Sequence, residues 1–251
     1  MDPKFRTLFV LNFFLTTASF ASTPVALVYN GKGTCQKACA IAMAIAVKEA
    51  GLSPRFVSES EITEQSNSEE ISALFKDAKV WIQPGGYAKE SFLAMSGPLK
   101  QGIRQFTASG GGYVGICAGA FMATEEIGTT GLSGLGLIPG RSATYFAHPA
   151  KPGLNYSMEN VRWQGEERQL YFEGGPFFYD LNPQVEVVAT YADGTSPAAV
   201  RGEYGLGRVF LSGPHPEAPE AWRTQDEVED SDGLDLQIAV DMIKWAARKK
   251  L

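Results

Sequence analysis

The chain has 251 residues, of which 44% are hydrophobic and 20% charged, and its formal net charge at pH 7 is −6. This is the composition of an ordinary globular protein, long enough for one large domain or two small ones with a substantial core. The negative charge argues against nucleic-acid binding, since the only basic cluster is the short tail Arg248, Lys249 and Lys250. Cations at that position are expected to complement the dipole of a final helix.

Residues 1–21 have the pattern of a secretory signal peptide. Lys4 and Arg6 precede the apolar run LFVLNFFL, which is followed by small residues up to Ala21. We predict cleavage after Ala21 and a periplasmic or secreted protein. The apolar run is short and interrupted, so no stable membrane insertion is expected after cleavage. The alternatives are a buried first strand and an uncleaved anchor.

Strand and helix patterns alternate over the first half of the chain. Apolar, β-rich runs predict strands at 24–30, 54–60, 79–86 and 112–117, and helices are predicted between them at 35–50, 67–78 and 88–108, the last broken near 96–98. Asn67 and Glu70 form a capping-box pattern, and Gly51 is placed to end the first helix. This alternation predicts an α/β fold, with a mostly parallel central sheet and helices on both faces.

Residues 126–185 interrupt the alternation. A stretch rich in glycine and turn residues comes first, and antiparallel strands are then predicted within 161–180 and 185–194, followed by a hairpin and one more strand within 196–217. The last helix is expected to place Leu234, Ile238, Met242 and Trp245 on one face. With no internal repeat or flexible linker, residues 22–251 are predicted to form one domain with a β-rich insertion in its second half.

The chain contains three cysteines, and two of them lie close together in the sequence. Cys35 and Cys39 are four residues apart and could touch on one helical turn, although helix geometry is poor for a disulfide. Two small packing residues are the alternative, and both interpretations stay open. The chain has only two histidines, neither of them near this pair, so no zinc site is predicted. We expect no metal and no cofactor.

The third cysteine, Cys117, lies where a predicted strand meets a predicted helix. The pattern Gly115-x-Cys117-x-Gly119 is the cysteine form of the nucleophile elbow, in which the glycines allow a sharp turn. The first N–H groups of the helix favour a thiolate, and the Ala118 N–H can stabilise an oxyanion. Taken alone, the motif fits a buried structural cysteine equally well.

A thiolate hydrolase needs a proton carrier, and the two histidines differ in their surroundings. His148 lies in the irregular insertion with no carboxylate nearby, whereas His215 follows the strand GRVFL and has Glu217 two residues on. His215 and Glu217 supply the base and the orienting acid of a triad with Cys117. The alternative is a turn with solvated polar groups.

The turn after the third strand contains a diglycine, Gly85-Gly86. The Gly86 N–H could be the second oxyanion donor, and a tight strand–helix turn is the alternative; the two interpretations are compatible. Further candidates for substrate contact are Gly85, Tyr87, Arg141 and Glu173. For Glu173, within YFEGGPFF, the alternative is an ordinary strand turn with aromatic packing.

These motifs together resemble a known family. GYVGICAGA, the PGG after a strand, and GRVFLSGPHPE resemble the class I glutamine amidotransferases, a flavodoxin-like fold with a Cys-His-Glu triad. The resemblance implies that Cys117 is the nucleophile, that His215 acts as general base and then acid, and that Glu217 orients it. VYNGKGT, PGGY, GICAGAF, YFEGGPFF and GPHPE further resemble the amidotransferase-like N-terminal domain of eukaryotic biotin–protein ligases and its stand-alone bacterial relatives.

The resemblance limits the expected chemistry. It does not extend to a biotin-ligase catalytic domain, so no biotin chemistry is expected. A histidine after the cysteine, common in the related protease and redox-chaperone superfamily, is replaced here by Ala118. Because an exported protein is an unsuitable partner for a synthetase, we expect hydrolysis of a C–N bond in a small-molecule or peptide amide. The alternative is a non-catalytic binding or scaffold domain that retains the fold. The sequence does not predict an oligomeric state.

Overall fold

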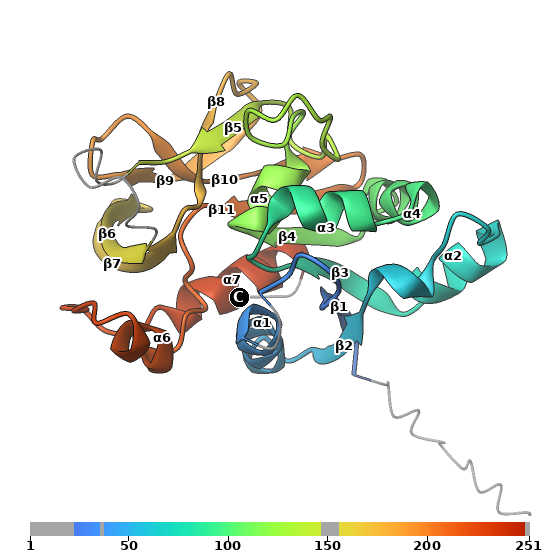
Figure 1. Cartoon of the computed structure of the whole chain (residues 1–251), viewed down its shortest axis with the longest axis horizontal. Helices are drawn as coiled ribbons and strands as arrows, with labels where there is room; N and C mark the ends of the chain where they lie inside the picture. The colour runs from blue at the N-terminus through green and yellow to red at the C-terminus, as the bar shows by residue number, and fades with distance from the viewer. Residues whose placement is uncertain (1–22, 36–37, 147–155, 249–251) are drawn as a thin grey trace, which may run out of the picture.

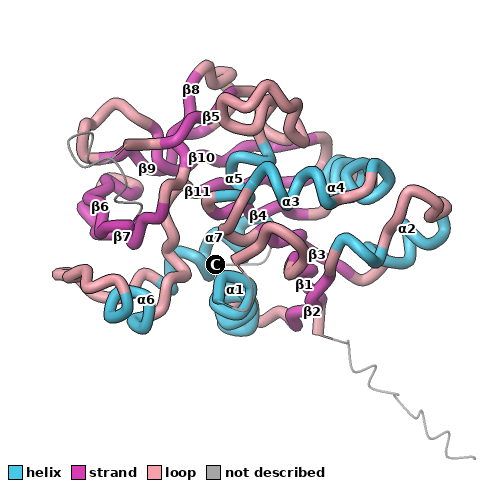
Figure 2. Tube along the Cα trace, viewed as in Figure 1, coloured by secondary structure: helices cyan, strands magenta, loops and turns pink. Residues whose placement is uncertain are grey.

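The alternating strands and helices expected from the sequence are present in the structure, a computed structural model that describes residues 23–35, 38–146 and 156–248. The predicted signal peptide and His148 lie outside these ranges. Figures 1 and 2 show a central sheet with helices packed on both of its faces. The predicted fold class is therefore confirmed.

The sheet has nine strands in the order β2-β1-β3-β4-β11-β10-β9-β6-β7. Its first five strands are all parallel: β2 (Ser53–Val57), β1 (Val25–Tyr29), β3 (Ala78–Gln83), β4 (Gly112–Ile116) and β11 (Gly207–Ser212). The other four are antiparallel: β10 (Pro197–Tyr204), β9 (Glu186–Tyr191), β6 (Tyr156–Trp163) and β7 (Glu166–Glu173). A separate two-stranded ribbon pairs β5 (Arg141–Thr144) with β8 (Pro176–Tyr179). Much of the β-rich insertion thus extends the main sheet.

The helices divide between the two faces of the sheet. The core on one face includes α1 (Ala38–Glu49) and α7 (Leu236–Ala246). The core on the other face includes residues of α2 (Ser68–Phe75), α3 (Ala88–Ala94), α4 (Gly97–Ala108) and α5 (Ala118–Ala123). A short 3-10 turn, η1 (Glu59–Glu61), follows β2, and α6 (Glu220–Gln225) lies between β11 and α7.

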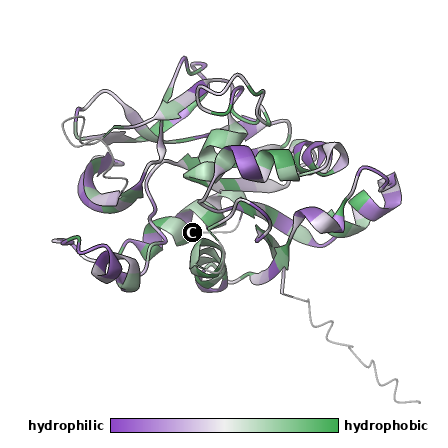
Figure 3. Cartoon of the chain, viewed as in Figure 1, coloured by the Kyte–Doolittle hydropathy of each residue, from purple (hydrophilic) through white to green (hydrophobic). Residues whose placement is uncertain are grey.

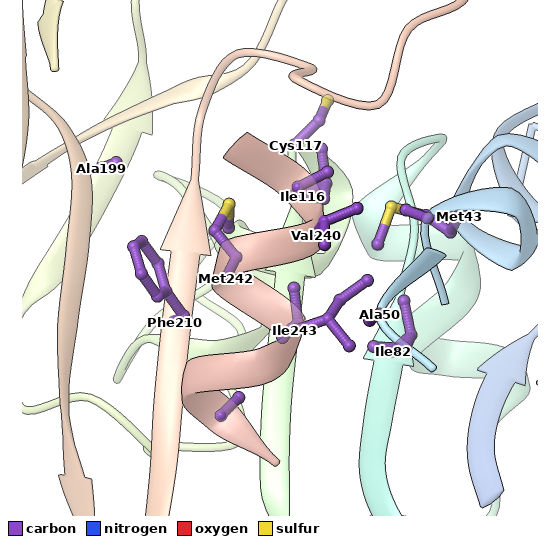
Figure 4. Packing of buried hydrophobic residues seen from close by; sticks show 14 of the residues in the cluster. Met43, Ala50, Ile82, Ile116, Cys117, Ala199, Phe210, Val240, Met242 and Ile243 are labelled. Atoms are coloured by element: carbon purple, nitrogen blue, oxygen red, sulfur yellow. The ribbon is translucent and has the colours of Figure 1, made fainter. Parts of the chain in front are cut away.

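Alternate residues of the parallel strands enter opposite cores. In β1, Val28 faces the core that contains α1 and α7, whereas Leu27 faces the other. This period of two, with both faces buried, explains why the central strands read as continuous apolar runs. Figure 4 shows Ile82 of β3, Ile116 of β4 and Ile243 of α7 in the first of these cores. Each fully buried side chain of this size contributes about 1.5–3 kcal/mol.

Several local expectations can be compared with the structure. The capping box is confirmed, since the Asn67 side chain accepts from the Glu70 N–H at 3.0 Å and the Glu70 carboxylate accepts from the Asn67 N–H at 2.9 Å. The break near 96–98 is also confirmed, because the Ser96 side chain caps α4. The strand predicted at 54–60 is too long, since β2 ends at Val57 and a 3-10 turn follows.

Two helix expectations need correction. Leu234 was expected on the buried face of the last helix, but it is exposed, because α7 begins only at Leu236. The buried face of α7 is formed instead by Ala239, Val240, Met242, Ile243 and Ala246. Helix α1 is hydrophobic over most of its surface, as Figure 3 shows, so that Ile41 and Ile45 remain exposed.

Candidate active site

The glycine-rich turns after the parallel strands meet at the carboxyl edge of the sheet, where ligands of such folds bind. The turn after β1 is held to the turn after β3 by backbone hydrogen bonds. The Cys35 N–H donates to the Gly85 carbonyl at 3.2 Å, and the Tyr87 N–H donates to the Gly33 carbonyl at 2.6 Å. The two turns therefore form one layer at this edge.

Cys117 occupies the bend between β4 and α5. Its φ of 48° lies in a region that residues with side chains rarely adopt, at a cost of about 1–3 kcal/mol. Packing explains both flanking glycines: a Cβ at Gly119 would lie 2.0 Å from the Gln83 carbonyl oxygen, and one at Gly115 would lie 2.5 Å from that of Gly119. Figure 4 shows Cys117 at the tip of β4, above the core. This is the strained elbow that the motif predicts.

His215 and Glu217 form a buried pair on the turn after β11. His215 Nδ1 lies 2.9 Å from Glu217 Oε1, and both side chains are almost fully buried. The His215 N–H donates to the Tyr171 carbonyl at 2.7 Å, and the imidazole meets the rings of Tyr171 and Trp222 edge-on. These contacts fix the ring and leave Nε2 as its free nitrogen.

The electrostatics of His215 favour the imidazolium. Burial alone lowers the pKa of His215, but the negative charge of Glu217 and then the interaction with Cys117 outweigh it, so the pKa lies well above its ordinary value. Within the described ranges, Nε2 makes no hydrogen bond of good geometry. The Cys117 Sγ instead lies 3.5 Å from the Glu173 carbonyl oxygen. Sγ nonetheless interacts with the His215 imidazole, and this interaction contributes to the raised pKa of His215.

The two predicted oxyanion donors lie on the turns that flank this site. Gly86 has a φ of 135°, and a Cβ there would lie 2.2 Å from the Gly33 carbonyl oxygen. Ala118 is buried and opens α5. Among the residues whose positions are described, neither the Gly86 nor the Ala118 N–H donates a hydrogen bond.

The remaining candidates differ in how close they come to the triad. Gly85 packs directly against the His215 imidazole, because a Cβ added to it would lie 2.5 Å from His215 Cε1. Glu173 contributes its carbonyl, while its side chain is exposed. Tyr87 precedes α3 and is 69% exposed. Arg141 is held by an ion pair with Glu126 at the start of β5.

Sequence reasoning missed several residues near the site. The charge of Cys117 contributes to the raised pKa of Tyr191, after the larger effect of burial. The Tyr191 hydroxyl donates to the Pro176 carbonyl at 2.8 Å, and its ring stacks on Tyr145. Trp222 could have been noticed, since it follows the HPE motif by five residues. Tyr191 lies on β9 and gave no local signal.

The structure also joins Cys35 and Cys39 in a disulfide, which the sequence left open. In the described part of the chain, no group of three or more His, Cys, Asp or Glu side chains could hold a metal ion. Over the same ranges, no helix combines the length and hydrophobicity needed to span a bilayer.

The fold is that of the class I glutamine amidotransferases. The structure superimposes on a crystal structure of a glutamine amidotransferase with a TM-score of 0.59 and 21% sequence identity, covering 86% of this chain and 98% of the other. The sequence model of the family described as "Biotin-protein ligase, N terminal" matches residues 25–153 and 147–246. The chain belongs to this biotin-protein ligase N-terminal family.

Two relatives show how far the similarity extends. A biotin–protein ligase of Schizosaccharomyces pombe is 27% identical over 161 residues, which are 54% of this chain and 25% of the ligase. An uncharacterized protein of Chlamydia muridarum is 29% identical over 165 residues, which are 58% of this chain and 63% of that protein. In both cases the matched region spans less than two thirds of the relative.

Proposed function

We propose that this protein is an exported cysteine hydrolase that cleaves a C–N bond of an amide through a Cys117-His215-Glu217 triad. The observation that carries the proposal is the buried His215–Glu217 pair, 2.9 Å apart, beside a cysteine held at a strained elbow. A buried carboxylate on one nitrogen of an imidazole and a thiol near the other supply the parts of a nucleophile–base–acid set.

In the first half of the reaction, the Cys117 sulfur attacks the amide carbonyl. The imidazolium of His215, favoured by its raised pKa, stabilises the thiolate and then protonates the leaving nitrogen. The N–H groups of Gly86 and Ala118 receive the negative charge that develops on the carbonyl oxygen. The C–N bond breaks, an amine or ammonia leaves, and a thioester of Cys117 remains.

In the second half, water hydrolyses the thioester. His215, now neutral, accepts a proton from the water as it attacks, and Glu217 stabilises the resulting imidazolium. The carboxylic acid leaves, and the sulfur returns to its starting state. General acid–base help of this kind contributes about 10²–10⁴-fold to the rate.

Hydrolysis, rather than ammonia transfer to a synthetase, follows from the proposed export of the chain. A small-molecule or peptide amide is the proposed substrate class. A non-catalytic binding domain with the same fold is the alternative, and reactivity of Cys117 separates the two, because only a catalytic site needs an activated thiol.

The test is alkylation of Cys117 by iodoacetamide, followed by mass spectrometry at about pH 6.5, with short peptides and simple amides as competitors. We expect labelling at least about tenfold faster than for an ordinary thiol, and slower labelling in His215→Asn. Cys117→Ala should stay folded, take up no label at this position and hydrolyse no amide. Labelling at the rate of an ordinary thiol, or amide turnover by Cys117→Ala, would contradict the proposal.

A further inference from the structure

A buried ion network lies next to the triad and takes no part in the chemistry described above. Its centre is Arg223 of α6, whose side chain is only 5% exposed. Arg223 Nε donates to Asp230 Oδ2 at 2.6 Å, and Nη2 lies 3.5 Å from Asp235 Oδ2. A guanidinium buried in this way must be well paired, because its desolvation is costly.

The same guanidinium is bonded to the turn that carries the triad. Arg223 Nη1 donates to the Ala218 carbonyl at 2.6 Å, and Ala218 directly follows Glu217. The Ala218 N–H in turn donates to the His215 carbonyl at 3.2 Å. A charged donor therefore holds the backbone one residue from Glu217, and charge-assisted bonds of this kind are short and strong.

The network continues to the strand on the other side of the site. Arg168 of β7 donates to Asp235 Oδ1 at 2.6 Å and pairs with Asp232 at 3.3 Å. Further along β7, the Tyr171 carbonyl accepts from the His215 N–H, and the Glu173 carbonyl contacts the Cys117 Sγ. The ion pairs thus join the turn of His215 and Glu217 to the strand that touches both His215 and Cys117.

We infer that Arg223 is a positioning residue, which holds the Glu217 carboxylate against His215 and so keeps the imidazole aligned with the thiol. The inference rests on the proposed function. A residue that only stabilised the fold would alter the unfolding midpoint, whereas one that positions the triad also alters how the reactivity of Cys117 depends on pH.

The experiment measures the rate of Cys117 alkylation by iodoacetamide from about pH 6.5 to 8.5. Burial raises the pKa of Asp235 to about 6 despite Arg168, so Asp235 is mostly ionised over this range. The wild-type rate is expected to change little. In Arg223→Met the rate at pH 8.5 should be about 50 times the rate of the same variant at pH 6.5, as for a thiol with an ordinary pKa near 8.5. Arg223→Lys keeps the positive charge but loses the several N–H donors of the guanidinium. The pH dependence of its labelling rate should lie between those of the wild type and Arg223→Met.

The matched control is Arg162→Met, which removes an exposed ion pair between Arg162 of β6 and Glu167 of β7 and should leave the profile unchanged. Circular dichroism checks folding. If Arg223→Met does not fold, Asp230→Ala, which removes the acceptor of the Arg223 Nε, should show the same change. A folded variant with the wild-type profile would refute the positioning role alone. An ordinary-thiol profile in the wild type would instead refute the proposed function, and the inference with it.

Discussion

Gly85 shows how much one missing side chain matters at this site. A methyl group there would lie 2.5 Å from His215 Cε1, so the imidazole leaves it no space, and at 3.4 Å from Cys39 Sγ it would also touch the disulfide. His215 cannot move away freely, because Glu217, Tyr171 and Trp222 hold it. Glycine, the smallest residue, therefore lets the Gly85-Gly86 turn and the imidazole come together.

We predict that Gly85→Ala destabilises the protein by about 1–3 kcal/mol through overpacking and slows Cys117 labelling at least about tenfold, because the imidazole must shift. The control is Gly97→Ala at the start of α4, where the added Cβ would meet only the flexible Glu64 carboxylate, at 3.3 Å. That variant should stay within about 1 kcal/mol of wild type. Urea unfolding and alkylation rates measure both. Equal labelling of the two variants would contradict the steric role of Gly85.

The sequence identified the residues whose signal is local. Cys117 lies in a glycine-framed elbow, and His215 and Glu217 are two residues apart, so short motifs were enough to find them. Arg223 and Tyr191 gave no such signal, because the partners that tie them to the site lie in other segments: Asp235, just before α7, pairs with Arg223, and Pro176 of β8 accepts from Tyr191. Contacts of this kind depend on the assembled sheet.

At the scale of elements, the disulfide joins α1 to the turn that precedes it. The backbone N–H of Cys35 donates a hydrogen bond to the Gly85 carbonyl. The Cys39 sulfur is also close to Gly85, since a Cβ added there would lie 3.4 Å from it. Because the loop it closes is short, the disulfide removes little entropy from the unfolded chain. Its main effect is expected on the local geometry of the Gly85-Gly86 turn.

We predict that the double variant Cys35→Ser/Cys39→Ser labels at Cys117 about threefold or more slowly than the oxidised wild type, with a small change in the unfolding midpoint. Treating the wild type with a dithiol reductant, and removing it before labelling, should produce the same slowing. The double variant serves as the control, since the reductant has no disulfide to act on there. Wild-type labelling that is indifferent to reduction would show that the disulfide does not support the site.

At the scale of the whole molecule, the parallel half of the sheet was easier to predict than the antiparallel half. The inner parallel strands β1, β3 and β4 are apolar runs followed by helices, so their places follow from local pattern and right-handed crossovers. Strands β6, β7 and β9 were expected as an insertion, yet they extend the main sheet through pairs such as Val161 with Tyr191. That pairing joins residues 30 positions apart, which periodicity alone does not specify.

The last prediction concerns where the whole chain acts. If residues 1–21 direct export, the full chain expressed in a Gram-negative host should be recovered from the periplasm with Ser22 as its first residue, because small residues precede the cut. In this oxidising compartment, Cys35 and Cys39 of the exported protein should be joined by a disulfide. Mass spectrometry of the intact protein and of its non-reduced peptides measures both.

The matched variant is Leu11→Arg, which places a charge in the apolar run. Because export depends on that run, the variant should stay in the cytoplasm at full length, with both thiols reduced. Wild-type protein that keeps Met1 and sediments with membranes would indicate an uncleaved anchor. Full-length wild type in the cytoplasm would exclude export, and with it the reason for preferring hydrolysis over ammonia transfer to a partner.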